Sequence, residues 1–103
     1  MTDHGEEIYY KYRVSVPKHK QNIQELKDEL QWAKAALIDI EQELKDGNIT
    51  QEEYEGRQEA MQMIIDGVTE SISMEYEFLQ HCEEFISAYE EKQQRESDQS
   101  FKN

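Results

Sequence analysis

Three histidines and one cysteine are the side chains in this sequence best suited to hold a metal ion or to act as a nucleophile. His4, His19 and His81 share no metal-ligand spacing with one another or with Cys82. His81 and Cys82 are adjacent, so on a helix their side chains would point about 100° apart. We therefore expect no metal site. Cys82 falls in an apolar helical pattern, where a thiol serves as a small hydrophobe, and a lone cysteine fits a reducing compartment such as the cytoplasm.

Adjacent glutamates are the candidates for acid–base catalysis. Such chemistry needs a concave pocket that raises the pKa of one carboxyl group, and helices packed along a narrow apolar stripe leave no such pocket. The pairs Glu52–Glu53, Glu83–Glu84 and Glu90–Glu91 instead fit a solvated acidic surface. Gly-rich phosphate loops and nucleophile motifs are also missing from the sequence. We expect a protein that is not an enzyme and that needs no cofactor.

The charge balance narrows the choice of partners. The chain has 24 acidic and 11 basic residues among 103, for a net charge of −13. A surface of this kind repels nucleic acid and anionic lipid as a whole. Four basic residues nevertheless fall within residues 8–20, which contain no acid: Lys11, Arg13, Lys18 and Lys20. No apolar run approaches the ~20 residues of a membrane span, so we expect no membrane association.

Two apolar stripes predict the fold. Positions spaced by three and four residues keep one face of a helix against another helix. The first stripe contains Ile23, Leu26, Leu30, Ala33, Leu37, Ile40 and Leu44. The second contains Tyr54, Met61, Ile65, Val68, Ile72, Leu79, Cys82, Ile86 and Tyr89. We predict a mainly α protein, a long antiparallel helical hairpin of the coiled-coil type, with helices over residues 18–46 and 51–94.

The turn between these helices, residues 47–50, carries the sharpest local signals. Gly47 can adopt the left-handed conformation that ends a helix. Thr50 followed by Glu53 predicts a capping box, in which each side chain binds a backbone N–H of the other, and Ile49 and Tyr54 predict the accompanying hydrophobic staple. Gly67 is a possible break in the second helix, which would give a three-helix bundle. The apolar spacing keeps its phase across Gly67, and we therefore expect the helix to continue.

Residues 8–16 alternate between apolar and polar side chains, which is typical of a strand. The first three residues at the apolar positions of this alternation are Ile8, Tyr10 and Tyr12. Pro17 would then begin the first helix. A lone strand needs a partner, and the same strand of a second copy would provide one. The alternatives are an extended arm packed on the helices, or a helical N-terminus. We expect one domain over residues 8–95, with disordered segments at 1–7 and 96–103.

Several apolar side chains fall outside the stripes or beyond the shorter helix, and these are the candidate contact residues. The predicted second helix is longer than the first, and the part that extends beyond the first helix is rich in aromatic residues. We expect the N-terminal segment to cover this part, within one chain or between two. Trp32, with Ala35 and Ile38, lies off the first stripe and suggests a surface for a second copy or for another protein. The candidate partner or dimer contacts are Tyr10, Tyr12, Trp32, Ala35, Ile38, Phe78, Phe85 and Tyr89.

Glu75 occupies a further position of the second stripe, between Ile72 and Leu79. A charged residue in such a stripe often sets the register of the helices. We expect Glu75 instead to reach water or to meet Lys20 or Lys27, because an unpaired buried carboxylate is costly.

Three functions are compatible with these features. The leading hypothesis is a non-catalytic, protein-binding helical module, expected to be homodimeric, that occupies a site on a partner as an inhibitor or adaptor. The second is an acidic mimic of nucleic acid, of the kind that phages use to inhibit host DNA-binding or defence proteins. The third follows from residues 8–16, whose basic strand with Lys11 and Arg13 before a helix resembles the ribbon-helix-helix DNA binders; this resemblance implies DNA binding through a two-stranded ribbon.

Overall fold

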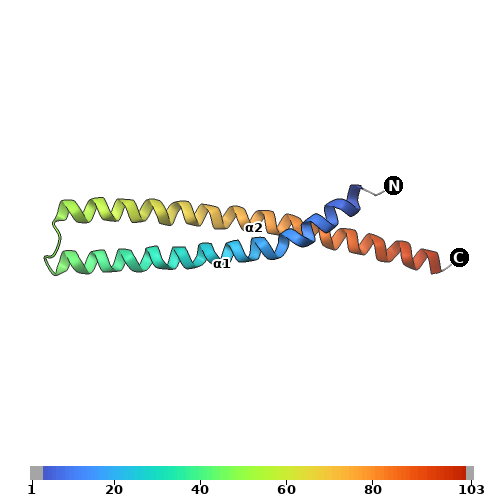
Figure 1. The fold of residues 1–103 in the computed structure, drawn as a ribbon, viewed down its shortest axis with the longest axis horizontal. Helices are drawn as coiled ribbons and strands as arrows, with labels where there is room; N and C mark the ends of the chain where they lie inside the picture. The colour runs from blue at the N-terminus through green and yellow to red at the C-terminus, as the bar shows by residue number, and fades with distance from the viewer. Residues whose placement is uncertain (1–3, 102–103) are drawn as a thin grey trace. The chain divides into compact units, whose positions relative to one another are not determined.

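The chain forms two long helices, α1 (His4–Lys45) and α2 (Gln51–Phe101), which make a helical hairpin (Figure 1). The computed structural model describes residues 4–101 and the side chains as far as residue 97. Within that range every residue outside the short connection 46–50 is helical, and no strand occurs. The predicted mainly α hairpin is confirmed.

The predicted strand or extended arm at residues 8–16 is wrong, because these residues belong to α1. Ile8 and Tyr10, two of the apolar positions of the predicted strand, are 37% and 59% exposed. The helical spacing of the first stripe continues backwards from Ile23 through residues 19, 16, 12 and 9, all of which are half-buried. A helix also satisfies its own backbone hydrogen bonds, whereas a single strand does not. The resemblance to ribbon-helix-helix proteins therefore loses its structural basis.

The helix ends also differ from the prediction. Pro17 lies inside α1 rather than at its start. α2 continues beyond residue 94 to Phe101, through residues that include neither glycine nor proline. Of the termini expected to be disordered, 4–7 and 96–101 are thus helical, and 1–3 and 102–103 lie outside the described residues.

The turn forms as predicted. Gly47 has a φ of 76°, the left-handed conformation. The Asn48 N–H donates to the Glu43 carbonyl at 2.9 Å and the Gly47 N–H donates to the Leu44 carbonyl at 3.1 Å, which is the hydrogen-bond pattern of a Schellman motif. In the capping box, the Glu53 N–H donates to Thr50 Oγ1 at 3.1 Å and the Thr50 N–H donates to Glu53 Oε1 at 3.3 Å. Both helix ends at the turn therefore have partners for otherwise free backbone groups.

The two predicted stripes are the covered faces of the helices. Ile23, Ala33, Val68, Leu79 and Cys82 are buried, and every other residue of the two stripes is half-buried. α2 continues without interruption through Gly67, as predicted. The core is one side chain deep, since each helix has a single neighbour.

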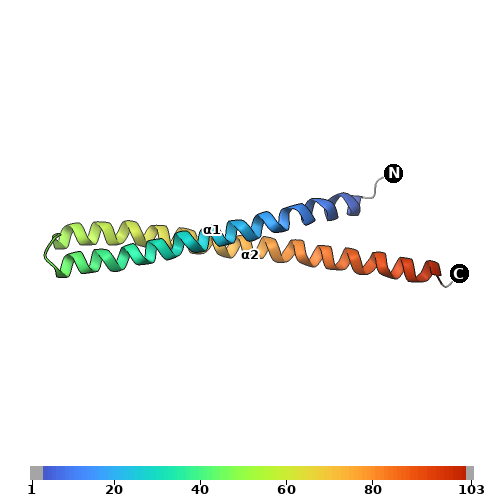
Figure 2. The same ribbon diagram turned by 60° about the horizontal axis from the view of Figure 1, so that its bottom comes forward.

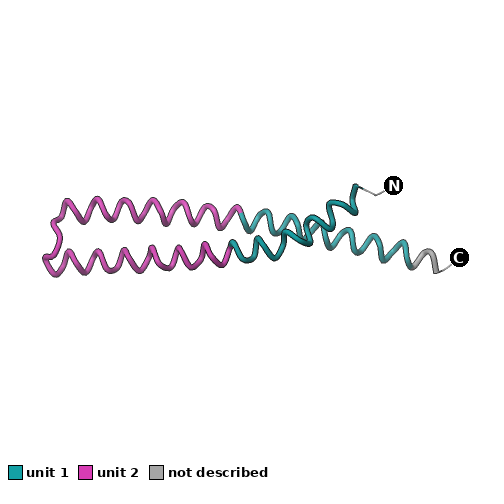
Figure 3. Tube along the Cα trace, viewed as in Figure 1, with its two compact units in different colours: residues 1–22, 75–103 teal, residues 23–74 magenta. Residues whose placement is uncertain are grey.

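The contacts divide the chain into two units (Figure 3). Unit 1 contains Met1–Asn22 and Glu75–Asn103, and unit 2 contains Ile23–Met74 with the turn. In unit 2 the two helices run side by side in opposite directions, as Figures 1 and 2 both show. No helix within residues 4–101 combines the length and apolar character needed to cross a membrane.

Candidate partner-binding surfaces

Unit 1 is held together by an aromatic cluster. Here the cluster means Tyr9, Tyr12, Phe78, Phe85 and Tyr89 with His19 and His81. Tyr9 stacks on Tyr89 with ring centroids 4.5 Å apart, and Tyr12 meets Phe85 edge-on at 5.4 Å. These geometries are the favourable ones for aromatic pairs. The sequence prediction that the N-terminal segment covers the aromatic end of the second helix therefore holds within one chain, with a helix in place of a strand.

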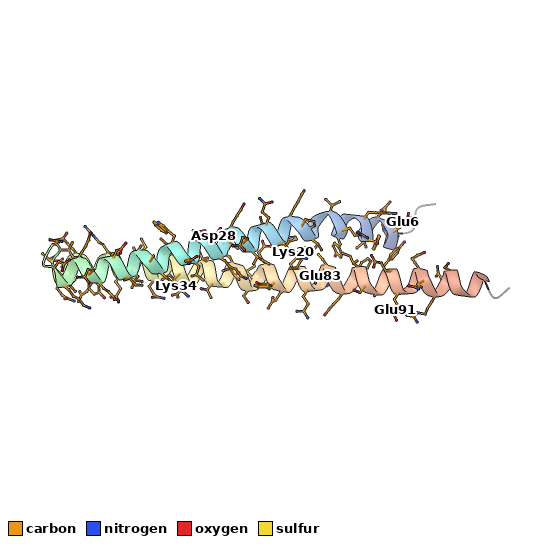
Figure 4. All side chains as sticks on the ribbon, turned by 90° about the horizontal axis from the view of Figure 1, so that it is seen from below. Glu6, Lys20, Asp28, Lys34, Glu83 and Glu91 are labelled. Atoms are coloured by element: carbon orange, nitrogen blue, oxygen red, sulfur yellow. The ribbon has the colours of Figure 1, made fainter. Side chains whose placement is uncertain are left out.

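Hydrogen bonds and ion pairs line one side of this cluster. The Tyr9 hydroxyl donates to Glu90 Oε1 at 2.7 Å, and Arg13 Nη1 donates to the same hydroxyl at 2.9 Å. Its hydrogen bond to Tyr9, with a smaller contribution from the Glu90 charge, raises the pKa of Arg13. The guanidinium of an arginine is charged in proteins with or without such a shift. Lys20 on α1 and Glu83 on α2 form a further pair at 3.9 Å (Figure 4). Exposed pairs of this kind contribute little to stability.

A polar pair interrupts the apolar stripes in unit 1. His19 Nδ1 lies 2.6 Å from Glu75 Oε2, and the two side chains are 22% and 25% exposed. The His19 ring also packs on Phe78, with centroids 4.6 Å apart. Glu75 therefore meets a histidine on the facing helix rather than the lysines expected from the sequence. A half-buried polar pair at a stripe position fits a role in helix register.

The cysteine and the histidines are the side chains best suited to chemistry. Cys82 is 0% exposed, and burial, with a smaller effect of Glu83, raises the pKa of its thiol, so little thiolate forms at neutral pH. His81 is exposed and contacts Tyr12 through Nε2 at 3.3 Å. Within residues 4–101, no three His, Cys, Asp or Glu side chains gather as a metal site would require. A depression lined by Val16, Pro17, Ile86 and Ser87 is open to solvent and flanked by the ion pairs of Arg13 and Lys20.

The eight candidate contact residues fall into two groups. Tyr12, Phe78, Phe85 and Tyr89 belong to the aromatic cluster, with Phe78 still 44% exposed, and Tyr10 lies beside Tyr9 at the cluster edge. Trp32, Ala35 and Ile38 lie in unit 2 on the outer side of α1, where Trp32 is 60% and Ile38 is 66% exposed. The structure brings the first group together and leaves the second group open.

Sequence reasoning missed four residues that the structure makes prominent. Tyr9 and His19 pack in the aromatic cluster, and their helical spacing from Tyr12, Val16 and Ile23 was the signal that could have found them. Met63 and Met74 are 69% and 62% exposed on α2 in unit 2. Both lie outside the second stripe, so attention to that stripe alone passed over them.

Comparisons with known proteins add no relatives: the chain matches no protein-family model, no curated protein and no solved structure.

Proposed function

We propose that this protein is a non-catalytic binding module that acts by occupying a site on a partner protein, as an inhibitor or an adaptor. The observation that carries the proposal is the exposure of Trp32 and Ile38 on the outer side of α1. Removing apolar side chains such as these from water is favourable, and tryptophan is frequent among the residues that dominate protein interfaces. The helices already bury one stripe each, so these side chains do not serve the hairpin itself.

We propose further that the patch formed by Trp32, Ala35 and Ile38 pairs two copies of the chain, and that the module binds its partner as this dimer. A thin core gains from further apolar burial, and helix-on-helix packing suits a patch with a small residue at its centre. Sedimentation equilibrium of the full chain should then give twice the mass of one chain. The variant Ile38→Glu should give a single-chain mass with unchanged helical circular dichroism.

The binding function itself is tested by affinity capture from the native host, with identification of the captured proteins by mass spectrometry. Trp32→Ala and Ile38→Glu should each reduce capture of a specific protein about tenfold or more, since loss of a central contact commonly costs over 1 kcal/mol. Lys18→Glu, at an exposed position on α1 about 21 Å along the helix from Trp32, is the control. Capture that is the same for all four proteins would remove the proposal.

Mimicry of nucleic acid is the second candidate, and the placement of the acids favours it. No charged side chain within the described residues is buried, so their carboxylates lie at the surface. The chain as a whole has 24 acids against 11 basic residues. A mimic should bind a DNA-handling protein, compete with DNA for it, and lose affinity steeply as salt rises. A captured partner that binds equally in low and high salt would exclude mimicry and leave the apolar patch as the contact.

A further inference from the structure

α2 has a second helical stripe in unit 2, and it is free of charge. Ala60, Ile64, Gly67, Ser71 and Met74 are spaced by four, three, four and three residues, the same spacing that defines the covered stripe. We call these five residues the Gly67 face. Over the ~21 Å from Ala60 to Met74, no charged side chain occurs in this stripe. A helix with two such stripes is typical of assemblies in which it packs against more than one neighbour.

One ion pair locates this face on the hairpin. Arg57 Nη1 lies 3.2 Å from Glu43 Oε2, so these residues mark one side of unit 2. Ala60 and Ile64 follow Arg57 by three and seven residues, and residues at these spacings share one face of a helix. The Gly67 face therefore lies on the same side of the hairpin as the ion pair between Arg57 and Glu43. On α1, Ala36 and Trp32 precede Glu43 by seven and eleven residues and lie on the same side.

The residues of this side are only partly covered by the chain. Ile64, Ser71 and Ala36 are half-buried where the helices meet, whereas Ala60 and Gly67 are exposed and Met74 is 62% exposed. A Cβ atom added to Gly67 would have no neighbour within 4 Å, and the residue does not have a positive φ. Nothing within the described part of the chain thus requires glycine at this position, where it costs about 1 kcal/mol relative to alanine. Its absent side chain leaves room for another backbone to approach.

The charges at the edges of this side are acidic. Glu25, Glu29 and Asp39 lie on α1 within about one-eighth of a turn of the Glu43 direction, and Glu70 borders the Gly67 face on α2. Arg57 is the one basic residue on this side of unit 2, and it is already paired with Glu43. Lys27 and Lys34 precede Glu43 by sixteen and nine residues, which places them about half a turn away, on the opposite side.

From the uncharged stripe and its acidic edges we infer that the Gly67 face binds an amphipathic helix whose apolar side is flanked by lysine or arginine. This inference rests on the proposed binding function and names the chemistry of the partner. Carboxylates on both edges complement basic flanks and so select the partner and speed its association. A second copy is the weaker occupant, because it would bring its own acidic edges against these acids.

The test uses the full chain and synthetic helical peptides of about 18 residues, long enough to span the face. The first peptide has leucines spaced by three and four residues with lysines beside them, the second replaces these lysines by glutamates, and the third is a scrambled version of the first. Trp32 is the only tryptophan and lies beside the face, so its fluorescence reports binding. We expect a blue shift and saturable binding with the first peptide, and at least about tenfold weaker binding with the other two.

Two matched pairs of variants locate the site. Gly67→Gln fills the place of close approach and raises helix propensity, so it should fold normally and weaken the lysine peptide about tenfold or more. Ser73→Gln, sixteen residues from Arg57 and facing the opposite side, should have no effect. Glu29→Lys should weaken the lysine peptide and strengthen the glutamate peptide, while Glu41→Lys, the same charge change on the opposite side of α1, should do neither.

Several results would overturn the inference. Equal effects within either pair of variants, or equal binding of the lysine peptide and its scrambled form, would show general attraction to an acidic protein. A wild-type dimer that Gly67→Gln converts to single chains would show that a second copy occupies the face. If the lysine peptide does not bind while capture of a native partner still depends on Ile38, the inference fails and the proposed binding function stands.

Discussion

His19 and Glu75 form a polar pair at positions where the helical stripes otherwise have apolar side chains. We predict that Glu75→Ala destabilises the protein by about 1–3 kcal/mol, because it removes the hydrogen-bond partner of a largely covered histidine. Replacing both residues by leucine should instead raise the free energy of unfolding by about 1 kcal/mol or more, since a covered polar pair is often less stabilising than apolar side chains of similar size. Urea unfolding followed by circular dichroism measures both changes.

The double variant also tests whether this pair sets the register of the helices. If it does, the leucine variant should gain stability but lose uniqueness, which would appear as a second set of amide peaks in the NMR spectrum. Glu43→Ala with Arg57→Ala, which removes an exposed pair in unit 2, is the comparison and should change stability by about 1 kcal/mol or less. A double leucine variant that is less stable than Glu75→Ala would contradict the assignment.

Cys82 should react slowly with thiol reagents in the folded protein. It should also make the free energy of unfolding depend on pH in the alkaline range. Burial raises the pKa of its thiol in the folded state, so the unfolded chain loses the proton first as the pH rises. The stabilisation is complete below the unfolded pKa of about 8.5 and is lost as the pH rises through the folded pKa. Urea unfolding at several alkaline pH values should show a steeper loss of stability for wild type than for Cys82→Ala. A thiol reagent should react with the native protein far more slowly than with the unfolded chain, and equal rates would contradict burial.

Individual side chains were predictable from sequence where one periodicity applied. Cys82 was expected in the core and is fully buried, because its position in the second stripe fits a helix alone. Tyr10 was expected against the second helix but is 59% exposed, because residues 8–16 fit both a two-residue and a three-to-four-residue repeat. The two-residue repeat places Tyr10 and Tyr12 on one face. The helical repeat pairs Tyr9 with Tyr12, as the aromatic cluster has them.

Pro17 lies in the interior of α1, where proline is unfavourable. Proline removes one backbone hydrogen bond and crowds the carbonyl of the preceding turn, here that of Arg13. We predict that Pro17→Ala stabilises the protein by about 1–3 kcal/mol and increases the helical circular dichroism. If residues 8–16 formed a strand or arm, Pro17 would instead start the helix, and its replacement by alanine would be neutral or unfavourable.

Lys18→Ala provides the control for this prediction, because Lys18 is also exposed and its replacement leaves the backbone hydrogen bonds intact. Its effect on stability should stay within about 0.5 kcal/mol. Thermal unfolding of both variants beside the wild-type chain is sufficient. Equal melting temperatures for all three proteins would mean that the residues before Pro17 contribute little to the cooperative unit.

The turn and both stripes could be predicted because their causes are local. The Schellman motif and the capping box bind residues at most five positions apart, so Gly47, Thr50 and Glu53 carry the information themselves. The N-terminal helix could not be settled in this way. Its deciding contacts join Tyr9 to Tyr89 and His19 to Glu75, far apart in the chain, and local β propensity outweighed them in the prediction. The Gly67 face was not predicted, because the prediction assigned one covered stripe to each helix.

The net charge of −13 is the property of the chain as a whole with the clearest consequence for stability. Carboxylates outnumber basic groups by about two to one, so their mutual repulsion opposes folding. Raising the salt concentration from about 0.01 M to about 1 M shortens the screening length from about 30 Å to about 3 Å. We predict that the melting temperature rises over this range. The loss of exposed ion pairs such as Arg13–Glu90 and Lys20–Glu83 acts in the opposite direction, but each contributes little.

A charge-reduced variant separates repulsion from other effects of salt. Glu77, Glu84 and Glu91 are exposed in unit 1 and recur every seven residues, about 10 Å apart along α2. Replacing the three by glutamine keeps helix propensity nearly constant and removes charges that lie within one screening length of each other at low salt. This variant should melt at a higher temperature than wild type in low salt and respond less to added salt. A wild-type melting temperature that falls as salt is added would mean that the ion pairs across the helices outweigh the repulsion. In that case the acids would be organised for attraction within the chain rather than left at the surface for a basic partner.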